Sequence, residues 1–168
     1  MADGFKPLID GETKIKVSST LDKSVGKKCL IDGSPETCWT SQQVPISSIP
    51  SHLSLTHTHR QGTPQYIQLS FSSAVIPRRV ELTFQGGFVG TKCSVEVLLV
   101  GAEKGQWRKW SSIFPEDVNR KQTFDLAPSE QDLADGNVES VKLVFEESSD
   151  FFGRVTVYDL QIWGVAVS

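Results

Sequence analysis

The sequence predicts an all-β sandwich or jelly roll of about eight short strands with little helix. Two observations lead to this prediction. Short runs of alternating or β-rich residues recur along the chain, and Gly and Pro residues separate them as turn signals. No long segment has the 3.6-residue spacing of apolar side chains that indicates an amphipathic helix. Short strands at this spacing, without helices between them, are typical of sandwiches and jelly rolls.

The predicted strands follow one another from the middle of the chain to its end. Residues 65–71 and 79–84 both alternate apolar and polar side chains, so one face of each strand should be buried. Pro77 is interpreted as turn punctuation between them. Helix is limited to a stub before a turn at 30–37 and a single turn at 129–134. Further strands are predicted at 93–100, 106–111, 121–126, 140–145 and 154–163.

The end of the chain predicts a closing strand with a distant partner. Residues 150–164 are interpreted as one strand that ends in Trp163-Gly164. Its expected partner lies far back in the chain, at residues 30–41. Such a pairing would join the early turn to the last strand.

Length and composition are those of one ordinary domain. A chain of 168 residues fits a single unit, and at about 150 residues folding buries roughly 68–70% of the unfolded surface. The net charge is −3 and the 17 basic residues are spread along the chain, so direct nucleic-acid binding is not indicated. The densest basic group is interpreted as a solvated face; it consists of Lys14, Lys16, Lys23, Lys27 and Lys28.

The cysteines and the apolar segments indicate the compartment. The N-terminus lacks the apolar stretch of a signal peptide, and the longest apolar run, residues 95–100, is far too short to span a membrane. Three cysteines are an odd number, which favours free thiols in a reducing environment. A Cys29–Cys38 pair remains an alternative. We expect the protein in the nucleus or the cytoplasm and not among secreted proteins.

Motifs of the common enzyme classes are missing from the sequence. It has no phosphate-binding loop, no Gly-x-Ser-x-Gly elbow and no His-Glu-x-x-His segment. Gly86-Gly87 follows a predicted strand but opens no helix, so a β-turn or bulge explains it. The acidic pairs Glu116-Asp117 and Glu146-Glu147 are interpreted as solvated surface. The sequence therefore predicts a protein that is not an enzyme.

A long polar segment at about residues 42–62 interrupts the strand pattern. Loops of this length inside a compact domain are uncommon and are often functional or disordered. The segment contains all the histidines of the chain, His52, His57 and His59. Two histidines at i and i+2 could share a transition metal, but a solvent-exposed polar loop is the favoured interpretation.

The turn at residues 32–37 offers side-chain oxygens close together. Asp32, Glu36 and Thr37 could help to hold a hard cation such as calcium, which takes six to eight oxygen ligands. The alternative is that Asp32 caps the turn and Thr37 bonds locally. The residues themselves leave both possibilities open.

The turn with Asp32, Thr37 and Trp39, together with a last strand that ends in Trp163-Gly164, resembles the discoidin or coagulation factor type C family of galactose-binding-like jelly-roll modules. Runs that cover most of residues 18–164, in order, resemble a small intracellular subfamily associated with nuclear receptors. These runs are 26–28, 32 with 36–39, 84–88, 114–117 with 119, 122–124, and 145–146 with 150–154. The segment at 42–62 is longer than this subfamily leads one to expect.

The resemblance implies a single discoidin-like domain over residues 1–168 that acts as a non-catalytic protein-interaction module. Its partner would be an orphan nuclear receptor, and its role that of a repressor-type transcriptional co-regulator. The wider family implies an alternative, the binding of a carbohydrate or a lipid headgroup. No catalytic residue can be carried over, and no cofactor is implied other than a structural calcium ion. The positions that match the calcium ligands of family members are Asp32, Thr37, Asp159 and Gln161.

Modules of this kind bind through loops at one tip of the sandwich. The expected loops are residues 22–26, 41–62, 86–92 and 148–153. Aromatic and Arg side chains are the commonest anchors of protein interfaces. The predicted partner-binding residues are therefore Arg60, Phe88, Phe151 and Arg154. Arg154 is also expected to form an ordinary surface ion pair, with Asp150 or with an acid on a neighbouring strand.

Overall fold

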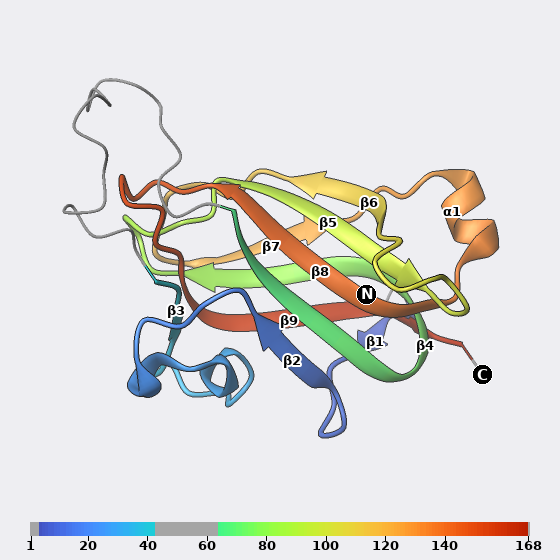
Figure 1. Ribbon diagram of the computed structural model, residues 1–168, viewed down its shortest axis with the longest axis horizontal. Coiled ribbons are helices and arrows are strands. Elements are labelled where there is room, and N and C mark those ends of the chain that lie inside the picture. The colour runs from blue at the N-terminus through green and yellow to red at the C-terminus, as the bar shows by residue number, and fades with distance from the viewer. Residues whose placement is uncertain (1–3, 43–63, 168) are drawn as a thin grey trace.

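The computed structural model describes residues 4–42 and 64–167, and these residues form an antiparallel β-sandwich of the jelly-roll type (Figure 1). The strands are β1 (Lys6–Pro7), β2 (Lys14–Val17), β3 (Trp39–Thr40), β4 (Gln65–Phe84), β5 (Lys92–Leu99), β6 (Arg108–Ile113), β7 (Lys121–Asp125), β8 (Val138–Glu147) and β9 (Thr156–Ala166). The helices are the 3₁₀ turns η1 (Lys23–Val25) and η2 (Lys27–Leu30) and the α-helix α1 (Glu130–Asp135). The predicted fold class is confirmed.

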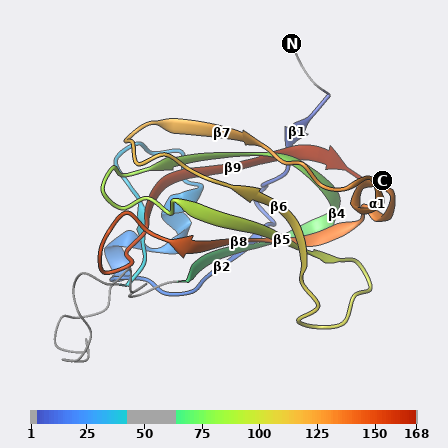
Figure 2. The ribbon, with the colours of Figure 1, turned by 90° about the horizontal axis from the view of Figure 1, so that it is seen from above.

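Strand β4 belongs to both layers of the sandwich. Its first part pairs with β2 and β8, and β5 and β6 extend that layer. Its second part pairs with β7 and β9, and β1 and β3 add to β9. Figure 1 shows β4 running to one end of the molecule, bending and returning, and Figure 2 shows the two layers from above.

The prediction of two strands separated by a turn at Pro77 is corrected in one respect. The two straight segments lie where the alternating pattern placed them, but one continuous bent strand joins them. Pro77 lies within that strand opposite Gly164, beside a register shift. A proline lacks the N–H that a regular ladder needs, so it is tolerated at such an irregularity.

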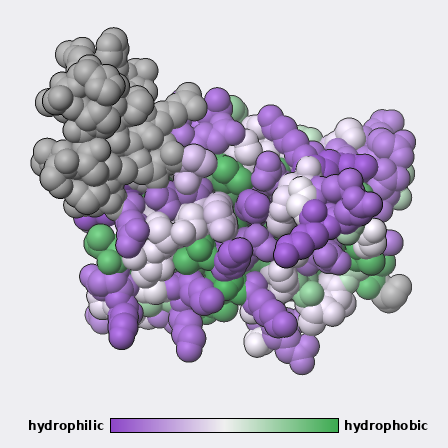
Figure 3. Space-filling model, viewed as in Figure 1, coloured by the Kyte–Doolittle hydropathy of each residue, from purple (hydrophilic) through white to green (hydrophobic). Residues whose placement is uncertain are grey.

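The core lies between the two layers, and the alternating pattern identified much of it. Ile67, Leu69, Val80, Leu82 and Phe84 are fully buried, as predicted. The view in Figure 3 shows a mostly hydrophilic surface in which the hydrophobic residues form small, separate areas. Most of the large apolar side chains are thus buried in the core.

The predicted pairing of the last strand with the early segment is confirmed. Trp39 lies opposite Val157 and Thr40 opposite Thr156, and the two threonine hydroxyls are 3.1 Å apart in the interior. The fully buried indole of Trp39 donates to the backbone carbonyl of Ser19 over 3.0 Å. The early turn is therefore anchored against the start of β9.

Several short elements were not predicted, and some predicted strands have different bounds in the structure. The alternating residues of β2 had been interpreted only as a solvated face, and its lysines are indeed exposed. Strands β1 and β3 are two residues long, which is too short for a pattern to show. Strand β6 begins and ends two residues later than predicted. The helical stub is η2, and the predicted turn at 129–134 is α1, which Ser129 caps.

All three cysteines are free thiols. Cys29 and Cys38 are half-buried, and Cys93 is fully buried, which raises the pKa of its thiol far above its ordinary value. A Cys29–Cys38 disulfide is therefore not formed in this structure.

Among the helices of the described residues, none is both long and apolar enough to cross a membrane.

Candidate functional site

Three loops meet at one end of the sandwich, opposite α1 and the C-terminus (Figure 1). They are residues 85–91 between β4 and β5, residues 114–120 between β6 and β7, and residues 148–155 between β8 and β9. We call them the tip loops. The sequence had predicted the first and the last as binding loops but had missed residues 114–120, because β-sandwich topology could not be assigned strand by strand.

Asp117 connects the three tip loops. Its carboxylate accepts the backbone N–H of Gly87 over 2.8 Å and the hydroxyl of Ser149 over 3.3 Å. The neighbouring Asn119 accepts the N–H of Gly86 over 3.3 Å. Loops fixed by hydrogen bonds lose less conformational entropy when they bind a partner. The tip is therefore a preorganised surface.

The loop at 85–91 begins with the predicted β-turn. The N–H of Phe88 donates to the carbonyl of Gln85 over 3.0 Å, and Gly87 has a φ of +90°. Only glycine adopts such a backbone conformation without strain. The carbonyl of Phe88 then accepts the N–H of Thr156 over 2.9 Å, which fixes Phe88 beside the start of β9.

The loop at 148–155 holds the backbone of Arg154 on both sides. The Asp150 carboxylate accepts the N–H of Arg154 over 3.0 Å, and the Ser148 hydroxyl donates to its carbonyl over 2.7 Å. The expected ion pair of the Arg154 side chain, with Asp150 or with an acid on a neighbouring strand, is therefore corrected: the described residues form neither pair. The turn closes when Gly153 donates to the carbonyl of Asp150, and this brings the carboxylate to the backbone of Arg154 instead.

The side chain of Arg154 stacks on Phe88 from the neighbouring loop. The guanidinium carbon lies 4.0 Å from the centre of the ring, which is the geometry of a cation–π contact. The Nε atom is buried and has no hydrogen-bond partner among the described residues. We call this pair the Arg154–Phe88 stack. It joins two residues that the sequence had proposed separately as partner-binding anchors.

Two exposed aromatic side chains lie in the tip loops. Phe151, in the same loop as Arg154, is 41% exposed and packs edge-on against Phe152 with ring centres 5.1 Å apart. Phe114, in the second tip loop, is 65% exposed and was not among the predicted anchors. Its position directly after a strand and before Pro115 was the available signal. Arg60, the fourth predicted anchor, lies outside the described residues, as do His52, His57 and His59.

The turn at 32–37 uses its carboxylate internally. Asp32 accepts the N–H of Ser34 over 2.9 Å and the hydroxyl of Thr37. Both bonds lower the pKa of the Asp32 carboxyl, and the bond from Thr37 has the larger effect. This arrangement is the one that the capping alternative predicts.

Asp159 and Gln161 lie on the outward face of β9, and their side chains interact. Burial raises the pKa of the Asp159 carboxyl, while a hydrogen bond from Gln161 and the charge of Lys121 oppose that rise. The nearby carboxylate of Asp32 also raises it, so the two predicted calcium-binding acids sense each other's charge. The structure thus brings the turn and the last strand together.

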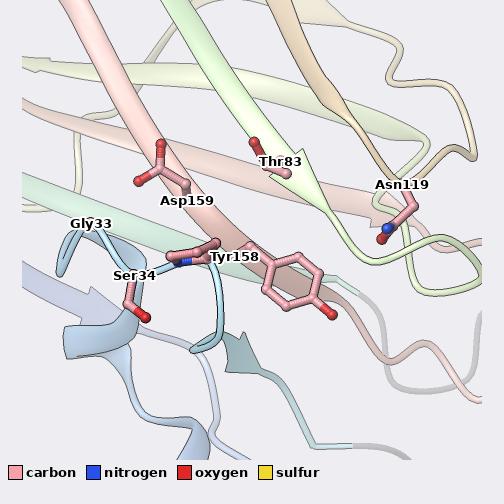
Figure 4. A pocket seen from close by; sticks show the side chains of 7 residues that line it. Gly33, Ser34, Thr83, Asn119, Tyr158 and Asp159 are labelled. Atoms are coloured by element: carbon pink, nitrogen blue, oxygen red, sulfur yellow. The ribbon is translucent and has the colours of Figure 1, made fainter.

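An open pocket of about 610 Å³ lies between the turn and the tip (Figure 4). At the register shift opposite Thr83 and Phe84, Tyr158 is the extra residue of β9, beside Asp159. An aromatic ring therefore lies next to a carboxylate. Strict alternation along the strand would place these two neighbouring side chains on opposite faces of the sheet. The lining residues are Gly33, Ser34, Pro35, Thr83, Asn119, Tyr158 and Asp159.

Calcium binding by Asp32, Thr37, Asp159 and Gln161 remains a prediction. The described residues contain no group of three or more His, Cys, Asp or Glu side chains placed to hold a metal ion. The Asp32 oxygens already accept hydrogen bonds, and Gln161 is neutral. A shell of six to eight oxygens fits this arrangement less well than the capping alternative does.

No model of a protein family matches the chain. Curated relatives do: the nuclear receptor 2C2-associated protein of Danio rerio is 36% identical over 161 residues, with 94% of each chain covered. The protein of the same name from Homo sapiens is 32% identical over 164 residues, which cover 95% of this chain and 97% of the relative.

Solved structures share the fold. An F5/8 type C domain from Bacteroides fragilis has a TM-score of 0.69 at 10% identity and covers 99% of this chain and 100% of its own. A family 32 carbohydrate-binding module from Clostridium perfringens NanJ, in complex with galactose, has a TM-score of 0.65 at 15% identity, with 95% and 98% covered. At these identities the likeness concerns the fold alone.

Proposed function

Because the chain belongs to the nuclear receptor 2C2-associated protein family, we propose that it is a non-catalytic module that binds a nuclear receptor through its tip loops. In this proposal it acts in the nucleus or the cytoplasm as a repressor-type co-regulator. The relatives' name supplies the class of partner, and the free cysteines agree with a reducing compartment.

The observation that carries the proposal is the Arg154–Phe88 stack with exposed Phe151 beside it in sequence. Aromatic and Arg side chains supply a large share of the binding energy in protein interfaces. Here they stand on loops that hydrogen bonds hold in place. Phe151 is 41% exposed, so its ring is available to a partner.

The test is a direct binding measurement between the purified full chain and the nuclear receptor 2C2. The Phe88→Ala/Phe151→Ser double variant should weaken binding at least about tenfold, as expected for two interface anchors. Val100→Ser is the matched control, because Val100 is 54% exposed and follows the far end of β5. Absence of receptor binding by the intact chain would refute the proposed partner, and equal affinities of all three proteins would refute the tip as its site.

A second function, the binding of a carbohydrate or a lipid headgroup, is favoured by the pocket beside Tyr158. An aromatic ring and polar side chains such as Asn119, Thr83 and Asp159 can contact the faces and hydroxyls of a carbohydrate. The structural neighbour from NanJ was solved with galactose. We would screen the chain against glycan and phosphoinositide arrays, with Tyr158→Ala as the variant. Binding that this variant abolishes would support the second function, and blank arrays would count against it.

A further inference from the structure

We propose that the Arg154–Phe88 stack is a receptor for a carboxylate of the protein partner, presented beside an apolar side chain. The inference rests on the proposed function, because it names the chemistry that the tip loops would recognise. The partner segment is thus an acidic residue, Asp or Glu, next to a large apolar one.

The first argument is that no carboxylate of the described residues forms an ion pair with Arg154. The described residues that form ion pairs through a cationic side chain are Arg79, Lys92, Arg108, Arg120 and Lys121. Arg154 is not one of them, and Asp150 in its own loop bonds to its backbone instead. Its buried Nε has no acceptor among the described residues. The described residues therefore leave hydrogen-bonding capacity of the Arg154 side chain unused.

The second argument is the shape of the donor. A guanidinium is a planar fork of N–H groups that matches the two oxygens of a carboxylate. The Phe88 ring lies against the guanidinium, with the guanidinium carbon 4.0 Å from the ring centre, and Arg154 is half-buried. A charge-assisted hydrogen bond is stronger in such a partly desolvated place than in open water. Neutral sugars offer hydroxyls to this fork but no opposite charge.

The third argument is rigidity. Asp150 and Ser148 hold the backbone of Arg154 from both sides, and Phe88 is fixed by its bond to Thr156. Neither partner of the stack must be ordered when the ligand arrives. Preorganisation of this kind lowers the entropic cost of association.

The fourth argument concerns the residue next to the acid. Phe151 is 41% exposed and braced by Phe152, and it lies in the loop that carries Arg154. Burying such a ring under an apolar side chain is favourable, whereas a purely ionic ligand would leave it in water. The combination therefore selects an acidic residue with an apolar neighbour over an isolated anion.

The test uses the full chain labelled with ¹⁵N at arginine and two synthetic peptides. The acidic probe is acetyl-Leu-Glu-Asp-Leu-amide, and the neutral probe is acetyl-Leu-Gln-Asn-Leu-amide. The Arg154 Nε–H signal, assigned by its loss in Arg154→Lys, should move with the acidic probe. That probe should bind about tenfold more tightly than the neutral one. Arg154→Gln should remove this preference.

Arg108→Gln is the matched control, because Arg108 lies on β6, outside the tip loops, and is paired with Asp132 at 3.2 Å and Asp135 at 3.3 Å. It should leave the preference for the acidic probe unchanged. The comparison of the two probes on the unaltered chain needs no variant, so misfolding of Arg154→Gln would not obscure the result.

Failure of this inference is distinguishable from failure of the proposed function. Equal binding of both probes, or no response of Arg154 to either, would overturn carboxylate recognition even if the receptor binds at the tip. A selective response to the acidic probe in a chain that ignores the receptor would uphold the inference and remove the named partner. Movement of the Arg154 signal by galactose or phosphoinositide vesicles alone would overturn both.

Discussion

The turn at 32–37 and the loop at 148–155 use their charged side chains in opposite ways. In the turn, the Asp32 carboxylate accepts bonds from Ser34 and Thr37, and its hydrogen-bonding capacity serves the fold. In the loop, Asp150 likewise bonds to the backbone, but this leaves the guanidinium of Arg154 without an acid. A charge that the fold has not paired is the one that a partner can use. An aspartate thus stabilises each region, and the loop in addition offers an arginine side chain to a partner.

The largest effect should follow from loosening the loop at its base. The fully buried hydroxyl of Ser41 accepts the N–H of Val155 over 2.9 Å. Ser41→Ala leaves that buried donor unpaired, which should lower the free energy of unfolding by about 1–3 kcal/mol. Urea denaturation measures this change, and faster hydrogen exchange of the Val155 amide should accompany it.

The control for this prediction is Ser112→Ala, since Ser112 is an exposed residue of β6. It should change the unfolding free energy by no more than about 0.5 kcal/mol. If Ser41→Ala were equally harmless, the anchoring of the 148–155 loop to the early segment would be wrong.

The contrast between the two regions also shows what sequence reasoning could and could not reach. Alternation located the core residues of β4, and the sequence predicted that the last strand pairs with the segment at 30–41, which contains Trp39. The sequence did not predict that β4 continues through Pro77, because a bend in a strand depends on which layers the strand joins. Local patterns fix the faces of strands, and tertiary packing fixes how they connect.

The candidate site was predictable to a similar depth. Residue type and loop position indicated Phe88, Phe151 and Arg154, but not that Phe88 and Arg154 would stack. The role of Asp150 depends on a backbone turn that closes at Gly153. Tyr158 entered the pocket only through a register shift in β9. Such contacts arise from the path of the backbone, which no spacing of residues records.

Asp32 should contribute stability that depends on pH with a definite sign. Hydrogen bonds from Thr37 and Ser34 lower its folded pKa below the unfolded value. Its contribution is therefore present above the unfolded pKa and is lost as the pH falls through the folded pKa. Asp32→Asn should be less stable than the unaltered chain near neutral pH, and the gap should close in acid. Denaturant titrations at several pH values would show a constant gap if this account is wrong.

Asp159 should show the opposite sign. Burial raises its folded pKa, so the charged form is disfavoured in the folded state. Stability is then lost as the pH rises from the unfolded pKa through the folded pKa. Asp159→Asn should be slightly more stable than the unaltered chain near neutral pH, and equal to it below the unfolded pKa. A loss of stability at neutral pH would mean that the Asp159 carboxylate has a favourable partner, such as a cation.

Calcium provides the smallest expected effect and the sharpest test of the turn. If the Asp32 carboxylate serves to cap the turn, the melting temperature should be the same in about 1 mM calcium and in excess EGTA. A bound ion would instead raise the melting temperature through its affinity for the folded state. That rise should disappear in both Asp32→Asn and Asp159→Asn, whereas Asp125→Asn, an exposed acid on β7 paired with Arg79, should keep it. Such a pattern would mean that the charged groups of the turn, like those proposed at the tip, bind a ligand.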